Sequence, residues 1–336
     1  MLKSSIIKNI LNIESDLYEK LENINVRDEI IGPIVDILHK NSELCEKKLS
    51  NGLYFKFKYS SKISRDFILS DLKYPDFVYE PQTTKLLLHL TQFSGDFLIG
   101  GAYFGDHSLL IANELSDNNY VHSFEANEKQ FNILQKNIEF NKIKNIYIYN
   151  KALWNVDDIL LSFDDEDACT VVGNYDSKKN SVKTVSIDNH CKLNNLNLLN
   201  TILLDIEGSE MNALDGGKDV ISDNNSPNII FEINNQFVDW SGGLKNTPII
   251  QKLKEFGYKD IFSIRDFQSN IDMTGCKIEL IPIDSTYLAS KSHGFNLIAT
   301  KNLNVLDGDN IRFIDGVSPK LLKHEDKRYH QPSEWK

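Results

Sequence analysis

Three acidic residues stand where apolar segments of this 336-residue chain end, at places where carboxylates can do chemistry. Asp205 directly follows the apolar residues 202–204, Glu207 comes two residues later, and Glu232 interrupts the apolar run 229–233. Carboxylates at one edge of a sheet can accept the proton of a reacting hydroxyl, and Asp205 is the leading base. The same three side chains can instead bind Mg²⁺ or Mn²⁺, and a buried ion pair is a purely structural alternative for Glu232.

A glycine-containing loop is the second candidate site. Gly100, Gly101 and Gly105 follow the apolar residues 97–99, and Glu125 comes twenty residues after Gly105. Glycine lets the backbone turn sharply and approach a ligand closely. An acidic side chain at the end of the following strand can accept hydrogen bonds from both ribose hydroxyls of a nucleoside cofactor. NAD and a plain tight turn stay open as alternatives, although the first glycine of an NAD-binding loop is poorly matched.

The elements that must position these residues are indicated by alternating apolar patterns. Short apolar runs alternate with helical periodicity, which is typical of a parallel sheet with crossover helices. The carboxyl ends of parallel strands meet at one edge, so the acidic residues are expected to converge there. The predicted strands are 97–99, 120–124, 146–149, 201–205, 228–233, 261–264 and 295–300, and the predicted helices are 108–115, 131–140, 209–221 and 248–256.

Other parts of the chain show different patterns. Residues 1–90 have helical periodicity followed by the alternating run 53–59, which predicts an arm of helices and a strand. The stretch 159–187 alternates like an antiparallel insertion. Beyond Lys301 the chain is polar, and a surface tail is expected.

Composition narrows the class of protein. The chain has 41% hydrophobic and 25% charged residues, which predicts a globular protein, and no apolar run is long enough to span a bilayer. A net charge of -11 disfavours a nucleic-acid partner. The four cysteines (Cys45, Cys169, Cys191 and Cys276) are far apart and predict neither zinc nor disulfides, and the first residues lack a secretion signal, so a cytoplasmic protein is expected.

Taken in order, the motifs resemble the FkbM family of S-adenosylmethionine-dependent methyltransferases over about residues 79–300. The order and intervals of the segments are more specific than any one of them. Two positions depart from the family pattern, because Ile99 stands where the family has Asp and Ala126 replaces a common proline. Asp106 is a candidate substitute for the missing carboxylate. The matching segments are 79–81, 101–105, 123–127, Asn137 and Asn141, 152–153, 186–188, 204–210 and 231–233.

The resemblance implies a fold and an activity. The fold class is α/β, a Rossmann-like class I methyltransferase with a mostly parallel seven-stranded sheet, helices on both faces and an N-terminal helical arm. The expected domains are the arm at 1–90, the methyltransferase domain at 91–302 with its antiparallel insertion at about 155–187, and a C-terminal tail at 303–336. The implied reaction is O-methylation of a small-molecule or sugar hydroxyl, with neither nucleic acid nor a membrane span involved. An NAD-dependent oxidoreductase, a degenerate non-catalytic module and a homodimer stay open.

Site residues are also implied by the resemblance. The catalytic candidates are Asp205, Glu207, Glu232 and His293, of which the first three are also the candidate Mg²⁺ or Mn²⁺ ligands. The expected S-adenosylmethionine contacts are Glu80, Gly101, Ala102, Tyr103, Phe104, Gly105, Asp106, His107, Ser108, Glu125, Ala126, Asn127, Ala152, Leu153 and Asp205.

Several polar residues have structural readings beside the functional ones. Glu210 suits the first turn of a helix, where acids favour the helix dipole. His89 lies on an apolar helix face and is expected to pack, whereas His107 and His293 each have a functional and a structural reading. Trp240, with the amides of residues 234–236, would suit a sugar pocket, and an ordinary loop is the favoured alternative for each residue taken singly.

Overall fold

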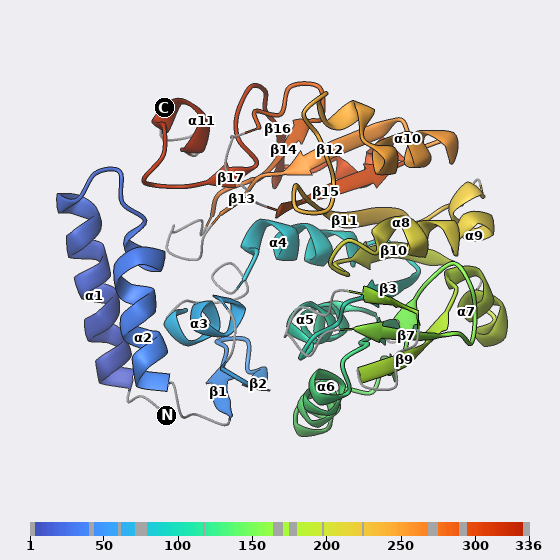
Figure 1. Cartoon of the computed structure of the whole chain (residues 1–336), viewed down its shortest axis with the longest axis horizontal. Helices are drawn as coiled ribbons and strands as arrows, with labels where there is room; N and C mark the ends of the chain where they lie inside the picture. The colour runs from blue at the N-terminus through green and yellow to red at the C-terminus, as the bar shows by residue number, and fades with distance from the viewer. Residues whose placement is uncertain are drawn as a thin grey trace.

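The structure is a computed structural model that describes residues 4–39, 44–59, 62–70, 79–116, 118–163, 171–174, 180–196, 198–223, 225–267, 275–288 and 294–331. Two parts are visible in Figure 1: a small group of helices at one side, formed by the first residues, and a large sheet with helices on both faces.

The large sheet has the order β16-β14-β12-β15-β11-β10-β3-β4-β5. Neighbouring strands from β5 to β11 run parallel, and β15 is antiparallel to both of its neighbours. The predicted Rossmann-like α/β sheet is therefore confirmed. Its strands are β3 (Asp96–Gly100), β4 (Val121–Phe124), β5 (Ile146–Tyr149), β10 (Leu199–Leu204), β11 (Asn228–Asn234), β12 (Asp260–Ile264), β14 (Ile278–Pro282), β15 (Gly294–Thr300) and β16 (Ile311–Phe313).

Two hydrophobic cores lie on the two faces of this sheet. Strand side chains alternate between them, so Phe97 and Ile99 join one core while Leu98 joins the other. One face is covered by α4 (Pro81–Leu90), α5 (Asp106–Glu114) and α6 (Glu128–Asn141). The other is covered by α7 (Ile187–Asn194), α8 (Glu210–Asp215), α9 (Lys218–Ser222) and α10 (Pro248–Glu255). The helix predicted at 209–221 is two helices, because Gly216 and Gly217 interrupt it.

The insertion after β5 forms a separate four-stranded sheet of order β6-β9-β7-β8. Its strands are β6 (Ala152–Leu153), β7 (Leu160–Phe163), β8 (Val171–Asn174) and β9 (Asn180–Val185). As predicted, β7 pairs antiparallel with both β8 and β9, while the short β6 pairs parallel with β9.

The sequence prediction is wrong for the C-terminal segment. Nine strands form the sheet instead of seven, because β14 and β16 extend it beyond β12. Besides β16, the chain beyond Lys301 contains η4 (Leu303–Leu306), β17 (Lys320–Leu321) and α11 (Lys327–His330). The strand β17 pairs with β13 (Asp266–Phe267). Leu303 and Phe313 of this segment are exposed, but several of its other apolar residues are buried, among them Val305, Ile311, Val317 and Leu321. They are too widely spaced to show a period, which is why a surface tail was expected.

The N-terminal arm begins with α1 (Ser4–Lys20), the π-helical turn η1 (Val26–Ile31) and α2 (Gly32–His39). The hairpin β1 (Cys45–Lys48) and β2 (Tyr54–Phe57) and the helix α3 (Lys62–Leu69) follow. The predicted boundary at residue 90 places α4 in the arm, but α4 packs against α5 and β14 of the main sheet. The arm proper therefore ends before α4.

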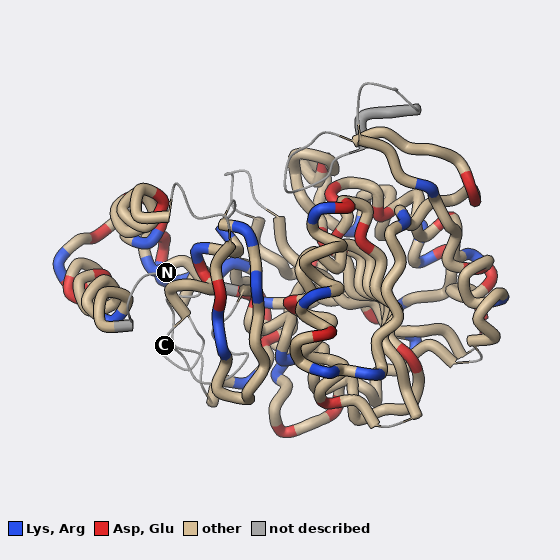
Figure 2. Tube along the Cα trace, turned by 90° about the horizontal axis from the view of Figure 1, so that it is seen from below, with Lys and Arg blue, Asp and Glu red and all other residues tan. Residues whose placement is uncertain are grey.

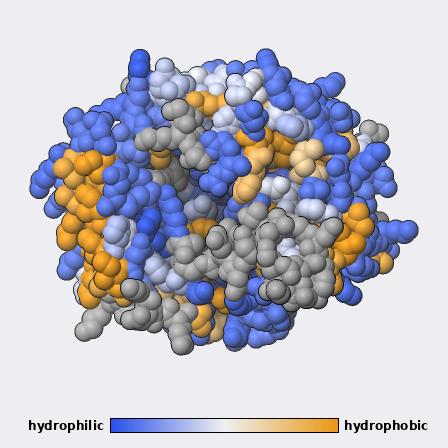
Figure 3. Space-filling view, in the orientation of Figure 1, coloured by the Kyte–Doolittle hydropathy of each residue, from blue (hydrophilic) through white to orange (hydrophobic). Residues whose placement is uncertain are grey.

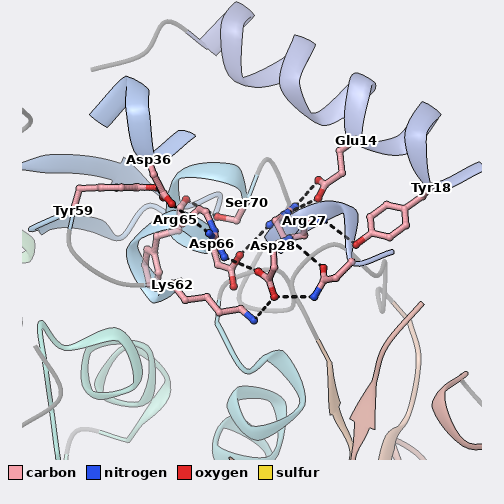
Figure 4. Close-up of polar contacts among 12 residues, drawn as sticks. Glu14, Tyr18, Arg27, Asp28, Asp36, Tyr59, Lys62, Arg65, Asp66 and Ser70 are labelled. Atoms are coloured by element: carbon pink, nitrogen blue, oxygen red, sulfur yellow. Dashed lines mark hydrogen bonds and ion pairs between the residues drawn. The ribbon is translucent and has the colours of Figure 1, made fainter. Parts of the chain in front are cut away.

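A buried ion network fastens the arm together, as Figure 4 shows. The Arg27 guanidinium donates to both oxygens of Glu14 at 2.5 and 2.7 Å and to Asp66 at 3.0 Å. Arg27 lies in η1, Glu14 in α1 and Asp66 in α3, and the exposed fractions of the three residues are 1%, 4% and 2%. One cation thus joins three helices, away from water.

Replacing Arg27 with Met is expected to reduce the free energy of unfolding by about 3–5 kcal/mol, because two buried carboxylates lose their counter-charge. Urea denaturation followed by circular dichroism measures the change. The matched control is Lys62→Met, which removes a partner of Asp28 that is 42% exposed, and it should cost less than about 1 kcal/mol. Equal losses in the two variants would show that the Arg27 network adds nothing special.

Candidate functional site

The glycine loop lies directly against the segment that follows β10. The amides of Gly101 and Ala102 donate to the Phe124 carbonyl at 3.0 and 2.9 Å, which holds the loop across the end of β4. Gly101 has a φ of +80°, and a Cβ there would lie 1.8 Å from the Asp205 carbonyl oxygen. No other residue type fits at this position without moving β10. The loop therefore brings its backbone to the start of the acidic segment.

The rest of the loop turns into α5. Gly105 has a φ of +96°, and a Cβ there would meet the Leu109 Cδ1 at 2.3 Å. Tyr103 also adopts a left-handed φ, of +48°, although it is not glycine. Asp106 is the first residue of α5 and is buried, and this burial raises the pKa of its carboxyl group. A carboxylate is therefore present beside the loop, although not at Ile99, whose side chain is buried in the core.

Phe104 connects the loop to the arm. Its ring lies 5.4 Å from Phe57 and 4.9 Å from Phe67, between centroids, so β2 and α3 both pack on it. The Asn137 amide in α6 donates to the carbonyls of Phe104 and Lys56, each at 2.9 Å. Asn137 thus holds both the loop and β2 in place, which gives this motif residue a structural role.

Glu125 lies beside the loop at the end of β4. Its Oε2 accepts the Tyr103 amide and its Oε1 accepts the Asn127 amide, both at 2.7 Å. Burial raises the pKa of Glu125 to about 7, although the two amide bonds oppose the shift. Each carboxylate oxygen keeps a second lone pair, so the oriented carboxylate can accept two further hydrogen bonds. This arrangement suits a pair of vicinal hydroxyls.

Other predicted cofactor contacts surround Glu125 and the loop. Asn127 caps α6 by accepting the Lys129 amide at 2.9 Å, and Asn150 donates to the Glu125 and Ala126 carbonyls at 2.9 and 3.1 Å. Leu153, after Ala152 in β6, lies so close to Gly100 that a Cβ there would come within 2.8 Å of its Cδ1. Ser108 accepts from the buried Ser123 hydroxyl at 2.9 Å, so it joins α5 to β4.

The acidic cluster is assembled as predicted. One carboxylate oxygen each from Asp205, Glu207 and Glu232 lie within 4.8 Å of one another. Burial, then the neighbouring Glu232 and Glu80 carboxylates, raises the pKa of Asp205 well above its ordinary value. Burial and then Glu207 raise the pKa of Glu232 to about 7, and Lys320 opposes this. A carboxyl group with a pKa near 7, such as that of Glu232, can exchange a proton near neutral pH.

Glu80 lies closer to the acidic cluster than the sequence suggested. It precedes α4 with a φ of +46°, and its Oε2 accepts the Asn296 amide at 2.6 Å. The His107 Nε2 is 4.0 Å from the same oxygen, and the His107 Nδ1 is 3.3 Å from the Thr84 hydroxyl. Burial and then Asp266 raise the pKa of Glu80 to about 7, against the effect of Lys320. Glu80 and His107 therefore connect the loop to the acidic cluster.

Three residues of this neighbourhood were missed by sequence reasoning. Asn296 lies beside Glu232 in the strand register, and as a polar residue in an apolar strand it carried the same signal as Glu232. Asp266 accepts the Gln82 and Thr83 amides at 3.0 Å each and so caps the start of α4. Lys320 in β17 lies opposite Asp266 in β13 in the strand register. No sequence signal marked Asp266 or Lys320, because both depend on the fold of the C-terminal segment.

The C-terminal segment is held in place by Arg265, which is fully buried. Its guanidinium donates to the carbonyls of Ser318, Tyr329 and Gln331 at 3.0, 2.9 and 2.6 Å and to Glu279 at 2.7 Å. These bonds fix the position of β17 and so of Lys320.

The remaining predictions divide into structural and untested ones. Glu210 accepts the Ile206 and Gly208 amides at 3.1 and 3.3 Å, which supports its helix-capping reading. His89 is buried, with its Nε2 2.9 Å from the Val305 carbonyl, as expected of a packing residue. Trp240 is buried against Phe295, so its ring faces the core instead of a pocket. His293 lies outside the described residues.

Residues 100–259 match the family model described as Methyltransferase FkbM domain. No curated protein gives a significant match. Similar solved structures include an O-methyltransferase from Bacillus cereus in complex with SAH, at 15% identity and a TM-score of 0.35, over 66% of this chain and 80% of that one. A precorrin-6y C5,15-methyltransferase from Geobacter metallireducens GS-15 is 10% identical, with a TM-score of 0.35, over 69% and 96% of the two chains.

A tRNA (uracil-54, C5)-methyltransferase from Pyrococcus abyssi in complex with S-adenosyl-L-homocysteine is 11% identical, with a TM-score of 0.38, over 77% of this chain and 44% of that one. At such low scores, these similarities add nothing to what the strand order shows. Within the described ranges, no helix is both long and apolar enough to cross a membrane.

Replacing Gly101 with Ala is expected to destabilise the fold by roughly 1–3 kcal/mol more than the same change at Gly316. Both glycines have positive φ, but a Cβ at Gly316 would meet nothing within 4 Å, whereas one at Gly101 meets the Asp205 carbonyl. The difference isolates the clash from the backbone strain. Urea denaturation of both variants measures it, and equal destabilisation would mean that the loop and the acidic segment can separate freely.

Proposed function

We propose that this chain is an S-adenosylmethionine-dependent methyltransferase that methylates a hydroxyl group of a small molecule or sugar. Residues 100–259 match the methyltransferase FkbM domain model. The observation that carries the acceptor proposal is the cluster of three carboxylates beside the glycine loop, because hydroxyl groups need a proton acceptor when they react. The family match favours methyl transfer over the nicotinamide alternative and over a module without activity.

The residues around the loop fit the cofactor. Gly101 leaves no Cβ between the backbone and a ligand, and the Glu125 carboxylate is oriented by two amides at the end of β4. In our proposal Glu125 accepts the ribose hydroxyls, and the loop from Gly101 to Gly105 lines the remainder of the site, with Asp106, His107, Ala126, Asn127, Ala152 and Leu153 around it. When bound, S-adenosylmethionine supplies a methyl group that is electrophilic because its sulfur is positively charged.

Asp205 is the proposed base. It follows β10 and lies where the loop contacts the acidic segment, so an acceptor bound beside the loop would meet its carboxylate. Burial and the neighbouring carboxylates raise the pKa of Asp205, and the pKa values of Glu232 and Glu80 are raised to about 7, so each of these groups is a stronger base in its ionised form than an ordinary carboxylate. Glu207 and Glu232 would orient the acceptor molecule by accepting hydrogen bonds from its other hydroxyl groups.

A sugar is the favoured acceptor because an exposed aromatic ring lies beside the carboxylates. Phe237 is 40% exposed, and a Cβ at Gly208 would lie within 2.8 Å of its ring. Gly208 is next to Glu207, so the ring lies beside the segment that carries one of the clustered acids. Sugars bind to proteins through an apolar ring face together with hydrogen bonds to their hydroxyls. Phe237 therefore replaces Trp240 as the proposed platform.

A divalent ion held by Asp205, Glu207 and Glu232 is the second candidate mechanism, since three carboxylate oxygens within 4.8 Å suit Mg²⁺ or Mn²⁺. The ion would lower the pKa of an acceptor hydroxyl. We also retain two proposals from the sequence, a cytoplasmic location and the absence of a nucleic-acid partner, the latter because the net charge of -11 repels phosphates.

Replacing Glu125 with Ala is expected to weaken binding of S-adenosylhomocysteine by about 10- to 100-fold, because charge-assisted hydrogen bonds worth roughly 1.5–3 kcal/mol are lost. Isothermal titration measures the dissociation constant. Glu128→Ala is the control, because Glu128 is exposed on the next helix. Unchanged affinity in Glu125→Ala would move the ribose site elsewhere, and no binding by the native chain at millimolar ligand would refute the cofactor assignment.

Replacing Asp205 with Asn is expected to reduce methyl transfer by roughly 100-fold or more while S-adenosylhomocysteine affinity stays within about twofold, because general-base catalysis is lost and binding is kept. Transfer of a labelled methyl group to a panel of glycans and hydroxylated small molecules measures turnover. Asp219→Asn, an exposed site on α9, is the control. Full activity in Asp205→Asn would exclude Asp205 as the base, and loss of native activity in EDTA with recovery in Mg²⁺ or Mn²⁺ would support the metal mechanism.

A further inference from the structure

The two helices of the arm present an aliphatic face to solvent. Ile6 and Ile13 on α1 are 40% and 52% exposed, and Ile37 on α2 is 74% exposed. Ile34 and Leu38, also on α2, are 45% and 48% exposed. Figure 3 shows a continuous hydrophobic strip over α1 and α2, at the side of the molecule away from the main sheet. We call these five residues the arm face.

The arm face is not needed for packing inside the chain. The opposite sides of α1 and α2 already form a small core with Ile10, Val26, Ile31 and Val35, which also includes Leu69 of α3. The Arg27 network fixes the two helices in this position through Glu14 and Asp66 (Figure 4). The helices therefore cannot turn their outer side chains inward without breaking buried ion pairs. A helix that is apolar on both sides is normally covered on both sides.

The size of the arm face matches a protein interface. Its five side chains expose on the order of 500 Å² of apolar surface, which is at the upper end for a monomer. With the polar residues around it, the face approaches the roughly 800 Å² that each partner buries in a standard interface.

Charge argues against a lipid surface. Residues 4–39 contain seven acidic and three basic residues, and charged positions lie along both helices (Figure 2). A surface that binds anionic membranes carries an excess of Lys and Arg around its apolar side chains. The arm has the opposite balance.

We propose that a second copy of this chain covers the arm face, so that α1 and α2 of two subunits form an antiparallel four-helix bundle about a twofold axis. A twofold interface uses the same patch on both subunits, and a flat aliphatic face can pack against its own copy by fitting ridges into grooves. The five side chains carry no hydrogen-bonding groups, so self-association leaves no buried polar atom of theirs unsatisfied. The bundle would lie away from the glycine loop and the carboxylates, so each subunit would keep a complete site.

The test is the mass of the full chain in solution, measured by sedimentation velocity over a range of micromolar concentrations. We expect the native chain to sediment as a dimer. Ile37→Asp and Ile13→Asp are each expected to raise the dimer dissociation constant roughly 100-fold or more, because each buries a charge in an apolar contact. Circular dichroism should be unchanged in both, since the substituted positions are exposed.

Leu193→Asp is the matched control. Leu193 is 69% exposed on α7, at the far side of the main sheet, so this variant should remain dimeric. A native chain that is monomeric throughout the range would overturn the proposal, as would a dimer that Ile37→Asp leaves intact. Co-sedimentation of a monomeric chain with phosphatidylglycerol vesicles, abolished by Ile37→Asp, would assign the face to lipid and also overturn it.

Discussion

The contact between Gly101 and the Asp205 carbonyl is the constraint on which the rest of the site depends. It presses the turn after β3 against the turn after β10, the neighbouring strand, with no space for even one methyl group. The glycine loop and the acidic segment are therefore parts of one packed contact. The proposed cofactor loop and the proposed base are consequently placed side by side by backbone packing alone, before any side chain is considered.

The parts surrounding this contact come from distant segments of the chain. Phe104 packs against the aromatic residues of the arm, and Asn137 joins the same loop to β2. On the acidic side, Glu80 arrives from the start of α4 and Asn296 from β15. Residues 100–259, which match the family model, contain the glycine loop and the three clustered carboxylates. Glu80 and Asn296 lie before and after this range, so other segments complete the candidate site.

The sheet could be predicted from the sequence, and the candidate cofactor residues could be chosen from it, because their signals are local. The apolar run 146–149 between two helical patterns indicates a strand. Glu125 is indicated as a candidate by its sequence spacing from the glycines. The C-terminal segment could not be predicted, because β16 and β17 are three and two residues long and gain their stability from partners far along the chain. The sugar-pocket alternative for Trp240 fails for a related reason. The neighbouring amides suited a pocket, but only the packing against Phe295 shows that the ring is buried.

The bonds of Arg265 have a consequence for how the protein matures during translation. The chain emerges from the ribosome in order, so Arg265 is synthesised more than fifty residues before Ser318, Tyr329 and Gln331, whose carbonyls it needs. Until those residues appear, the interior position of Arg265 would leave most of its N–H groups without acceptors, which is costly. The buried setting of Arg265, and with it the pairing of β13 with β17 that sets Lys320 beside Asp266, can therefore form only after those last residues have been synthesised.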